Sequence, residues 1–169
     1  DVYKAQLPPT QGTGSFMQDT KIAVIGGSGI YDIDGLQDAD WVTVETPWGA
    51  PSDQVLTGTL DGVAMVFLPR HGRGHVHTPT SVPYRANIDA LKRLGCTDVI
   101  SLCACGSFRE ELAPADFVIG VQSIDPTKAP QTPFFGLGRF AHLARVHLTC
   151  PRLRAPRATP TPTHPISRP

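Results

Sequence analysis

The chain has 169 residues, enough for one domain with its own hydrophobic core, and its 15 basic and 15 acidic side chains give a formal net charge of zero. All the acidic residues lie within residues 1–125, so the zero is a cancellation between an acidic part and a basic end. No apolar run reaches the roughly 18 residues of a membrane span, and residues 1–20 lack a signal-peptide pattern, so we expect a cytoplasmic protein without a membrane partner.

Ordered structure is expected to begin at Lys21, after a loose polar leader over residues 1–20. KIAVIG (21–26) is a β-branched run that ends in glycines, which is typical of a buried strand that leads into a functional loop. Asp61-Gly62 is a two-residue hairpin signal between two apolar runs. The two runs, at residues 54–60 and 63–69, and the preceding run at residues 41–46 predict three strands that form an antiparallel meander.

A helix is predicted next, because Tyr84, Ile88, Leu91 and Leu94 recur at helical spacing up to a glycine. The segment before it, residues 80–83, offers an N-cap hydroxyl and an early proline. Two more buried strands are predicted, at residues 98–106 and 116–121. The order of strand, hairpin, helix and strand indicates an α/β fold with a mixed β-sheet flanked by helices.

The character of the chain changes after Asp125, where nine of its 17 prolines lie. Six of these fall in residues 151–169, which show no apolar period, so we expect a disordered tail over residues 154–169. Its basic side chains are not interleaved with aromatic ones, which disfavours a nucleic acid partner. The four cysteines form no CxxC pair and fit reduced thiols better than a disulfide frame or a zinc site.

The glycine-rich stretch GGSGIYD (26–32) follows the first strand. Its glycines could let backbone N–H groups approach an oxyanion, with the Ser28 hydroxyl as a further donor. It matches neither the dinucleotide-binding pattern nor a Walker A loop. A tight structural turn is therefore an equal alternative.

The stretch LPRHGRGHVHTP (68–79) holds two arginines and three of the six histidines of the chain. A metal site is disfavoured, because the histidines are separated by glycines, no carboxylate is nearby and two arginines would repel a cation. Arg70 offers a fixed fork for a phosphate or a carboxylate, and His71 can add a hydrogen bond. An anion site at the end of a strand is the favoured interpretation, with a solvated basic loop as the alternative.

Four segments taken together resemble the methylthioadenosine phosphorylase branch of the purine nucleoside phosphorylases, in the same order and with similar spacing. They are IAVIGGSGIYD (22–32), TPWGAPSD (46–53), LPRHGRGHVHTPTSVPYRANIDALKRLGC (68–96) and ACGSFREEL (104–112). The resemblance runs from Lys21 to about Leu153, so residues 21–153 are expected to form the N-terminal part of a nucleoside phosphorylase domain.

The resemblance implies the phosphorolysis of 5′-methylthioadenosine, or of a related purine nucleoside, to a free purine and a pentose 1-phosphate in purine and methionine salvage. It implies no cofactor and no metal, and a homotrimer for family members of full length. Five residues match the phosphate-binding positions of the family, namely Ser28, Arg70, His71, Cys103 and Ala104. His75 and His77 are left as loop residues near the substrate or a neighbouring subunit.

The sequence departs from the family in two respects. Cys103 replaces a Thr or Ser and is a weaker hydrogen-bond donor, so phosphate affinity is expected to fall. After Leu153 the likeness stops, which resembles a truncated or frameshifted gene and leaves the base-facing acid in the part that is missing. A catalytically inactive fragment that keeps a phosphate pocket is therefore one alternative, and a phosphorylase for 6-oxopurine nucleosides is another.

Overall fold

The computed structural model describes residues 20–120 together with residues 134, 149–150 and 153. The expected leader and the expected tail over residues 154–169 lie outside these residues, save for Thr20. Residues 1–106 and 107–169 form two compact units, which are described separately. The strands and helices named below all belong to the first unit, and no helix in the described residues has the length and apolar character that a membrane span requires.

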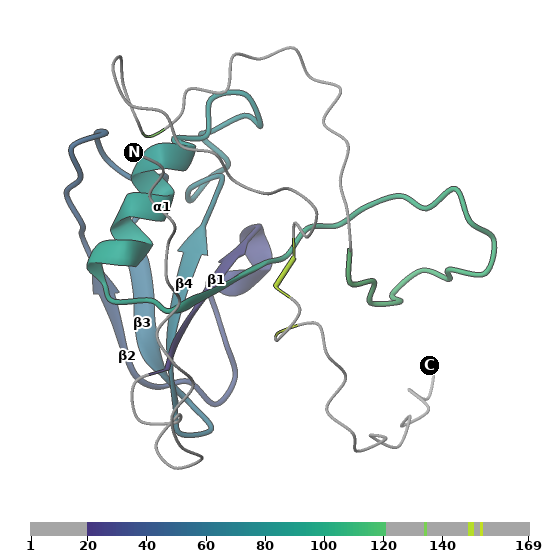
Figure 1. The fold of residues 1–169 in the computed structure, drawn as a ribbon, viewed down its shortest axis with the longest axis horizontal. Coiled ribbons are helices and arrows are strands. Elements are labelled where there is room, and N and C mark those ends of the chain that lie inside the picture. The colour runs from purple at the N-terminus through teal and green to yellow at the C-terminus, as the bar shows by residue number, and fades with distance from the viewer. Residues whose placement is uncertain (1–19, 121–133, 135–148, 151–152, 154–169) are drawn as a thin grey trace, which may run out of the picture. The chain divides into compact units, whose positions relative to one another are not determined.

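A five-stranded mixed sheet forms the centre of the first unit, in the order β2-β3-β4-β1-β5. Figure 1 labels the strands from β2 to β1 in this order. Strand β1 is parallel to both of its neighbours, β4 and β5, whereas β2, β3 and β4 form an antiparallel meander. The strands are β1 (Lys21–Gly26), β2 (Gln37–Val42), β3 (Val55–Leu60), β4 (Val63–Pro69) and β5 (Asp98–Ser101). The predicted α/β fold with a mixed sheet is confirmed.

The predicted hairpin joins β3 to β4. Asp61 and Gly62 have φ angles of 49° and 77°, the left-handed pair that a two-residue type I′ turn requires. The register places Leu60 opposite Val63, so the turn leads directly into the strand pairing.

Strand β2 lies earlier in the chain than the predicted 41–46, because the chain leaves the sheet after Val42. Residues 46–49 form a turn instead, in which the Gly49 amide donates to the Thr46 carbonyl at 3.1 Å. The Thr46 hydroxyl also accepts a hydrogen bond from the Trp48 amide at 3.1 Å. The Thr46 carbonyl and the Gly49 amide pair with each other within this turn, and Pro47 has no N–H. These backbone groups are therefore not available to extend the strand.

Strand β5 ends at Ser101, so the prediction of a strand over residues 98–106 was too long. Its partner β1 ends at Gly26, and the last backbone bond between the two segments runs from the Leu102 amide to the Ile25 carbonyl at 2.8 Å. Beyond this point no backbone partner continues the ladder within the described residues.

The prediction of a buried strand at 116–121 is wrong for the residues that the structure describes, because residues 116–120 form no strand. They belong to the second unit, and Phe117, Val118 and Ile119 are exposed rather than buried. A run of apolar residues specifies a buried strand only when neighbouring strands are present to pair with it.

An ion pair also lies within the second unit. Arg109 pairs with Glu111, and this hydrogen bond lowers the pKa of the Glu111 carboxyl.

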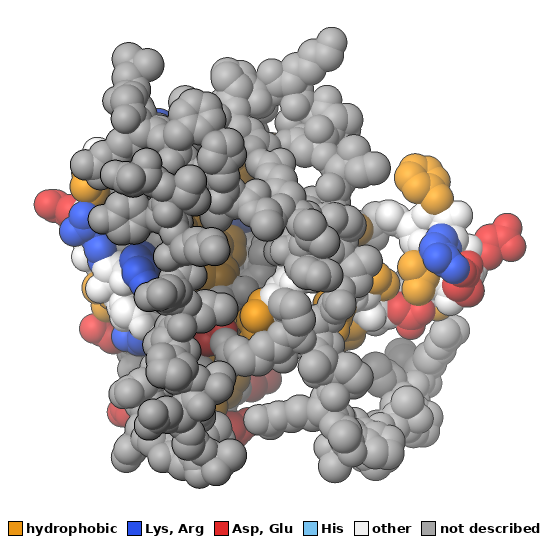
Figure 2. All heavy atoms as spheres, viewed as in Figure 1, with side chains coloured by type: hydrophobic (Ala, Val, Ile, Leu, Met, Phe, Trp, Pro, Cys, Tyr) orange, Lys and Arg blue, Asp and Glu red, His pale blue; other side chains and the backbone are white. Residues whose placement is uncertain are grey.

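The predicted helix is α1 (Tyr84–Arg93), and it lies over the sheet in Figure 1. Its buried residues are Ala86, Asn87, Ala90 and Leu91. Tyr84 and Ile88, which the periodicity placed on the apolar face, are 58% and 41% exposed, so the buried face is rotated relative to the prediction. Charged side chains lie on the outer surface around α1 (Figure 2).

The start of α1 also differs from the prediction, because no side chain caps it. The N-cap residue is Pro83, and the Ser81 hydroxyl instead accepts a hydrogen bond from the Thr78 amide at 2.8 Å. A serine can satisfy a local turn in place of a helix end, since both use the same hydroxyl.

Two hydrophobic clusters lie on the two faces of the sheet, because successive residues of a strand point to opposite sides. Ala23, Val66 and Leu68 belong to one cluster, together with Leu91 of α1. The residues that alternate with them belong to the other cluster, which contains Val24, Leu56, Phe67 and Ile30. Both faces of β1 and β4 are therefore packed, which explains why these strands are almost continuously apolar.

Candidate functional site

Three loops meet at one edge of the sheet, because β1, β4 and β5 run parallel and end together. Gly26 pairs with Pro69, and Ile25 pairs with Ser101. The Arg70 amide donates to the Gly26 carbonyl at 3.0 Å, which carries the pairing of β1 and β4 one residue further. The carboxyl ends of neighbouring parallel strands are where open α/β sheets bind ligands.

The predicted site residues all follow these three strand ends. Ser28 begins a short 3-10 helix after β1, although its side chain lies outside the described part of the chain. Arg70 and His71 follow β4, and Cys103 and Ala104 follow β5. Strand β1 lies between the other two strands, so residues separated by more than 70 positions in the sequence share one edge.

The Arg70 side chain crosses from the end of β4 to the end of β5. Its Nη1 donates to the Leu102 carbonyl oxygen at 2.5 Å, and its Nε donates to His71 Nε2 at 3.1 Å. A guanidinium has five N–H groups, so three of them have no partner among the described residues. Arg70 therefore combines a fixed position with donors that remain available for an anion.

The hydrogen bonds of His71 define its tautomer. Its Nδ1 lies 2.9 Å from the His77 carbonyl oxygen, which can only accept, so Nδ1 carries a proton. Its Nε2 faces an N–H of Arg70, which can only donate, so Nε2 accepts. His71 thus orients Arg70 in this arrangement, with both of its ring nitrogens engaged.

The loop over residues 71–77 is closed by its own backbone. The His77 amide donates to the His71 carbonyl at 3.0 Å, and the His75 amide donates to the Gly72 carbonyl at 3.0 Å. Gly72 has a φ of +69°, and a Cβ at this position would lie 2.7 Å from the Ser52 carbonyl oxygen. Only glycine meets both conditions, so Gly72 shapes the loop that carries Arg70 and His71.

Arg73, the second arginine of this loop, is a tether. Its amide donates to Asp53 Oδ2 at 2.8 Å, and its Nε lies 3.3 Å from the same oxygen. Its Nη2 donates to Gln54 Oε1 at 3.0 Å, and its guanidinium lies over the Trp41 ring at 4.3 Å. Asp53 and Arg73 thus hold the loop against the β3 side, a role that sequence reasoning missed although both residues lie in the segments quoted above.

A second connection that the sequence analysis missed joins the 46–53 segment to α1. The Ser52 amide donates to Asn87 Oδ1 at 2.8 Å, and Asn87 Nδ2 donates to the Ser52 hydroxyl at 2.9 Å. Both residues are buried, with 6% and 2% of their surface exposed. The signal was available, because Asn87 is a lone amide among residues at helical spacing, and a buried amide requires a partner.

Cys103 and Ala104 are exposed at the end of β5. The Cys103 sulfur lies 3.4 Å from the sulfur of Cys105. This hydrogen bond, with the charge of Cys103, raises the pKa of the Cys105 thiol, while the positive charge of Arg70 opposes the rise.

The glycines after β1 have different roles. A Cβ at Gly26 would meet Ile30 at 2.8 Å, so packing requires this glycine. A Cβ at Gly27 or Gly29 would meet no atom within 4 Å, and neither glycine has a positive φ. The described chain itself therefore does not require glycine at 27 or 29, which favours a loop that leaves room for a ligand over a purely structural turn.

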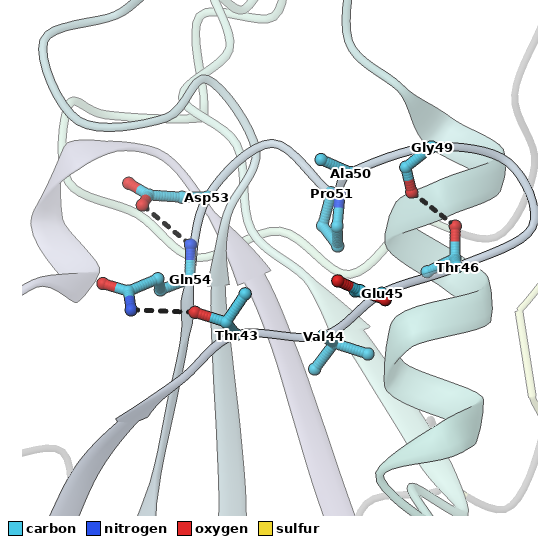
Figure 3. Close-up of a pocket in the computed structure, with 9 residues that line it drawn as sticks. All are labelled: Thr43, Val44, Glu45, Thr46, Gly49, Ala50, Pro51, Asp53 and Gln54. Carbon is cyan, nitrogen blue, oxygen red and sulfur yellow. Dashed lines mark hydrogen bonds between the residues drawn. The ribbon is translucent and has the colours of Figure 1, made fainter.

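A hollow of about 560 Å³ lies elsewhere, in the segment between β2 and β3 (Figure 3). Its carboxylates are Glu45 and Asp53, and Asp53 is already bound to Arg73. It offers no cation to an anionic ligand, because its lining residues are Thr43, Val44, Glu45, Thr46, Gly49, Ala50, Pro51, Asp53 and Gln54. The chemistry for an anion is at the strand ends and not in this hollow.

The histidines of the 71–77 loop do not form a ligand set. His75 stacks against His71 with ring centres 6.0 Å apart, and His77 contributes its carbonyl oxygen to His71. No group of three His, Cys, Asp or Glu side chains in the described residues is arranged to hold a metal ion. At this edge, Arg70 instead offers N–H donors of the kind that suit an oxyanion.

Comparison with known proteins identifies relatives of this arrangement. The sequence profile of the Phosphorylase superfamily matches residues 21–164. S-methyl-5′-thioadenosine phosphorylase from Cereibacter sphaeroides is 68% identical over 136 residues, which cover 80% of this chain and 47% of that protein.

Solved structures agree with this comparison. A methylthioadenosine phosphorylase from an Antarctic soil metagenomic library matches with a TM-score of 0.74 and 47% identity, over 80% of this chain and 48% of that one. Methylthioadenosine phosphorylase from Schistosoma mansoni in complex with adenine matches with a TM-score of 0.73 and 41% identity, over 80% of this chain and 50% of that one. The chain spans about half the length of the curated relatives that it matches.

Proposed function

Because the chain belongs to the phosphorylase superfamily, we propose that its strand-end site binds inorganic phosphate for the phosphorolysis of 5′-methylthioadenosine or a related purine nucleoside. The products are a free purine and a pentose 1-phosphate, within purine and methionine salvage. One observation carries the proposal: the ends of β1, β4 and β5 lie side by side, and the Arg70 guanidinium reaches from the end of β4 to the Leu102 carbonyl after β5.

The relatives support the choice of substrate. Two of the solved structures are methylthioadenosine phosphorylases, and one of them was solved with adenine. The identity of 68% to the Cereibacter sphaeroides protein extends over 136 residues, which are 80% of this chain. The preference for adenine over 6-oxopurine substrates is part of the proposal.

In the proposed mechanism, the free N–H groups of Arg70 hold the phosphate dianion. Backbone N–H groups after Gly26 and at Ala104 approach from the two neighbouring strand ends, with the Ser28 hydroxyl and the Cys103 thiol as further donors. These fixed dipoles position a phosphate oxygen for attack on the anomeric carbon as the bond to the purine breaks. The electron pair of that bond leaves with the purine, which then takes a proton.

His71 has two proposed roles, which follow from its contacts. While its Nε2 accepts from Arg70, it holds the guanidinium at the mouth of the site. When phosphate takes over the Arg70 donor, a protonated Nε2 can donate to the same phosphate. No cofactor or metal takes part, since Arg70 supplies the positive charge that offsets the dianion.

A second candidate function is a chain that binds phosphate without turning over nucleoside. It is favoured by the assigned residues, all of which belong to the phosphate side. No residue is assigned to the ribose or to the departing purine, and groups of that kind each contribute several kcal/mol to the transition state.

The two functions separate in one experiment with two polypeptides, the 169-residue chain and a chimera that continues after Leu153 with the corresponding part of the Cereibacter sphaeroides relative. Phosphate-dependent purine release is measured from 5′-methylthioadenosine and from inosine. We expect adenine release by the chimera, and phosphate binding without detectable turnover by the 169-residue chain. A folded chimera that neither binds phosphate nor releases adenine contradicts the proposal.

We also propose a cytoplasmic location and, for the form as long as its relatives, a homotrimer. The homotrimer follows from the family resemblance. Light scattering of the chimera measures the oligomer directly, and a monomer of normal activity would contradict the trimer.

A further inference from the structure

Two thiols lie in contact beside the proposed phosphate site. The sulfur atoms of Cys103 and Cys105 are 3.4 Å apart, and both side chains are exposed. A disulfide needs about 2.05 Å between its sulfur atoms, so closure requires a movement of about 1.4 Å. Exposed side chains at the end of a strand can make this movement by rotation, without displacing packed residues.

We propose that Cys103 and Cys105 form a reversible dithiol–disulfide site, and that its oxidation weakens phosphate binding. The first part stands on the geometry of the two thiols alone. The second part rests on the proposed function, in which Cys103 and Ala104 contact phosphate. The oxidant belongs to the class of hydroperoxides, with hydrogen peroxide as the simplest member.

The chemistry balances with one peroxide molecule. The thiolate of one cysteine attacks a peroxide oxygen, the O–O bond breaks, and a sulfenic acid and one water form. The second thiol then attacks the sulfenic sulfur, the S–S bond forms, and a second water leaves with the sulfenic oxygen. Two thiols and one hydrogen peroxide thus give one disulfide and two waters, with two electrons passing from sulfur to oxygen.

The hydrogen bond with Cys103 raises the pKa of the Cys105 thiol. Either cysteine can supply the attacking thiolate, and the other cysteine then attacks the sulfenic sulfur. The positive charge of Arg70 nearby stabilises a thiolate at this edge of the sheet.

Cys96 provides an internal comparison. It is 8% exposed within the hydrophobic cluster below α1, and burial raises the pKa of its thiol. Peroxide attacks accessible thiolates, so Cys96 is expected to stay reduced while the Cys103–Cys105 pair oxidises. The difference follows from position, because both environments lie in the same unit.

Closing the disulfide acts on phosphate in two ways. It removes the Cys103 thiol as a hydrogen-bond donor, and it constrains the backbone of Ala104, whose N–H is a proposed phosphate ligand. The same segment begins at Leu102, whose carbonyl holds the Arg70 guanidinium. Loss of one hydrogen bond to a charged ligand corresponds to about a tenfold weaker affinity.

The test uses the 169-residue chain treated with hydrogen peroxide, then quenched and digested with trypsin. Cleavage after Arg93 and Arg109 releases a peptide that contains Cys96, Cys103 and Cys105. We expect this peptide to lose two hydrogens, with fragmentation blocked between the two later cysteines and Cys96 alkylated. Dithiothreitol should restore its original mass.

Phosphate binding is measured on the same samples by titration calorimetry. Oxidation should weaken it by about tenfold, and dithiothreitol should restore it. The matched control is Cys105→Ser, which leaves Cys103 in place but cannot form the disulfide. After the same peroxide treatment and reduction of any sulfenic acid with arsenite, its phosphate affinity should be unchanged.

The outcomes separate the two proposals. Independent alkylation of Cys103 and Cys105 after peroxide treatment, with no bond between them, overturns the dithiol site. A disulfide that leaves phosphate affinity unchanged overturns the link to phosphate. If the disulfide forms on oxidation but the reduced chain does not bind phosphate, the dithiol site stands and the proposed function is contradicted instead.

Discussion

The Nε of Arg70 donates to Nε2 of His71 at 3.1 Å, although the two residues are adjacent in the chain. Neighbouring residues at the end of a strand normally point to opposite sides. Here the turn after β4, closed by the Gly72 amide on the Pro69 carbonyl at 3.1 Å, brings both side chains to the same side. The pair forms one unit, in which the imidazole fixes the guanidinium.

The first prediction concerns the charge at the site. Arg70→Ala should weaken phosphate binding by about 1.5 to 3 kcal/mol, roughly 10- to 150-fold, because it removes a charge-assisted donor. Calorimetric titration with phosphate measures the change. Arg93→Ala is the control, since it removes an exposed arginine of α1 that pairs with Asp89. Equal affinity in the two variants would remove Arg70 from the site.

The second prediction concerns the thiol at a family hydroxyl position. Cys103→Thr should strengthen phosphate binding about 2- to 10-fold, because a hydroxyl is a better hydrogen-bond donor than a thiol. Cys105→Ser, two residues away, should leave the affinity unchanged. Weaker binding by Cys103→Thr would mean that the sulfur contributes through packing and not through a hydrogen bond to phosphate.

The third prediction concerns the buried bond between α1 and the 46–53 segment. Asn87→Ala should lower the free energy of unfolding by about 2 to 3 kcal/mol, because it leaves the buried Ser52 amide and hydroxyl without a partner. Urea unfolding measures the loss. Lys92→Ala on the exposed side of the same helix should stay within about 0.5 kcal/mol of the parent chain. A comparable loss in the free energy of unfolding of both variants would show that the hydrogen bonds to Ser52 do not stabilise the fold.

The fourth prediction separates backbone conformation from space in the 71–77 loop. Gly72 and Gly74 both have positive φ, +69° and +76°, but only Gly72 lacks room for a Cβ. Gly74→Ala should lower stability by about 1 to 2 kcal/mol from conformation alone. Gly72→Ala should lower it by at least about 1 kcal/mol more, because the methyl group meets the Ser52 carbonyl. Urea unfolding of the two variants compares their losses of stability. An equal loss would show that the backbone around Gly72 shifts to accommodate the methyl group.

The fifth prediction concerns metals. Removal of divalent ions with EDTA should leave phosphate affinity and the melting temperature unchanged, because Arg70 supplies the positive charge and both ring nitrogens of His71 are already engaged. Thermal unfolding with and without EDTA measures this. A fall in melting temperature that zinc restores would assign a metal to the chain.

Local patterns were sufficient to predict the strands β1, β3 and β4, the Asp61-Gly62 turn and the helix α1. Each depends on features within a few residues, such as β-branched runs, a left-handed turn pair or an apolar period of 3.6. A buried strand was also predicted from the sequence at residues 98–106, where β5 lies. The family resemblance added the expectation that residues after β1, β4 and β5 bind phosphate.

The ends of β2 and β5, and the face that α1 buries, depended on the tertiary structure. A strand continues only as far as its partner does, so β5 ends where β1 ends. The buried face of α1 depends on Asn87 meeting Ser52, which lies 35 residues away. Sequence periodicity cannot identify a partner so distant in the sequence, because it describes one segment at a time.

The site divides in the same way. The sequence by itself determined that a loop with two arginines, which we predict to bind an anion, follows a buried strand. Only the tertiary structure distinguished the roles of the two arginines. Arg73 lies against Asp53 and Trp41, whereas Arg70 reaches the carbonyl of Leu102 across the end of β1. Both arginines have the same local chemistry, and their roles differ because the sheet brings different distant residues within hydrogen-bonding distance of each.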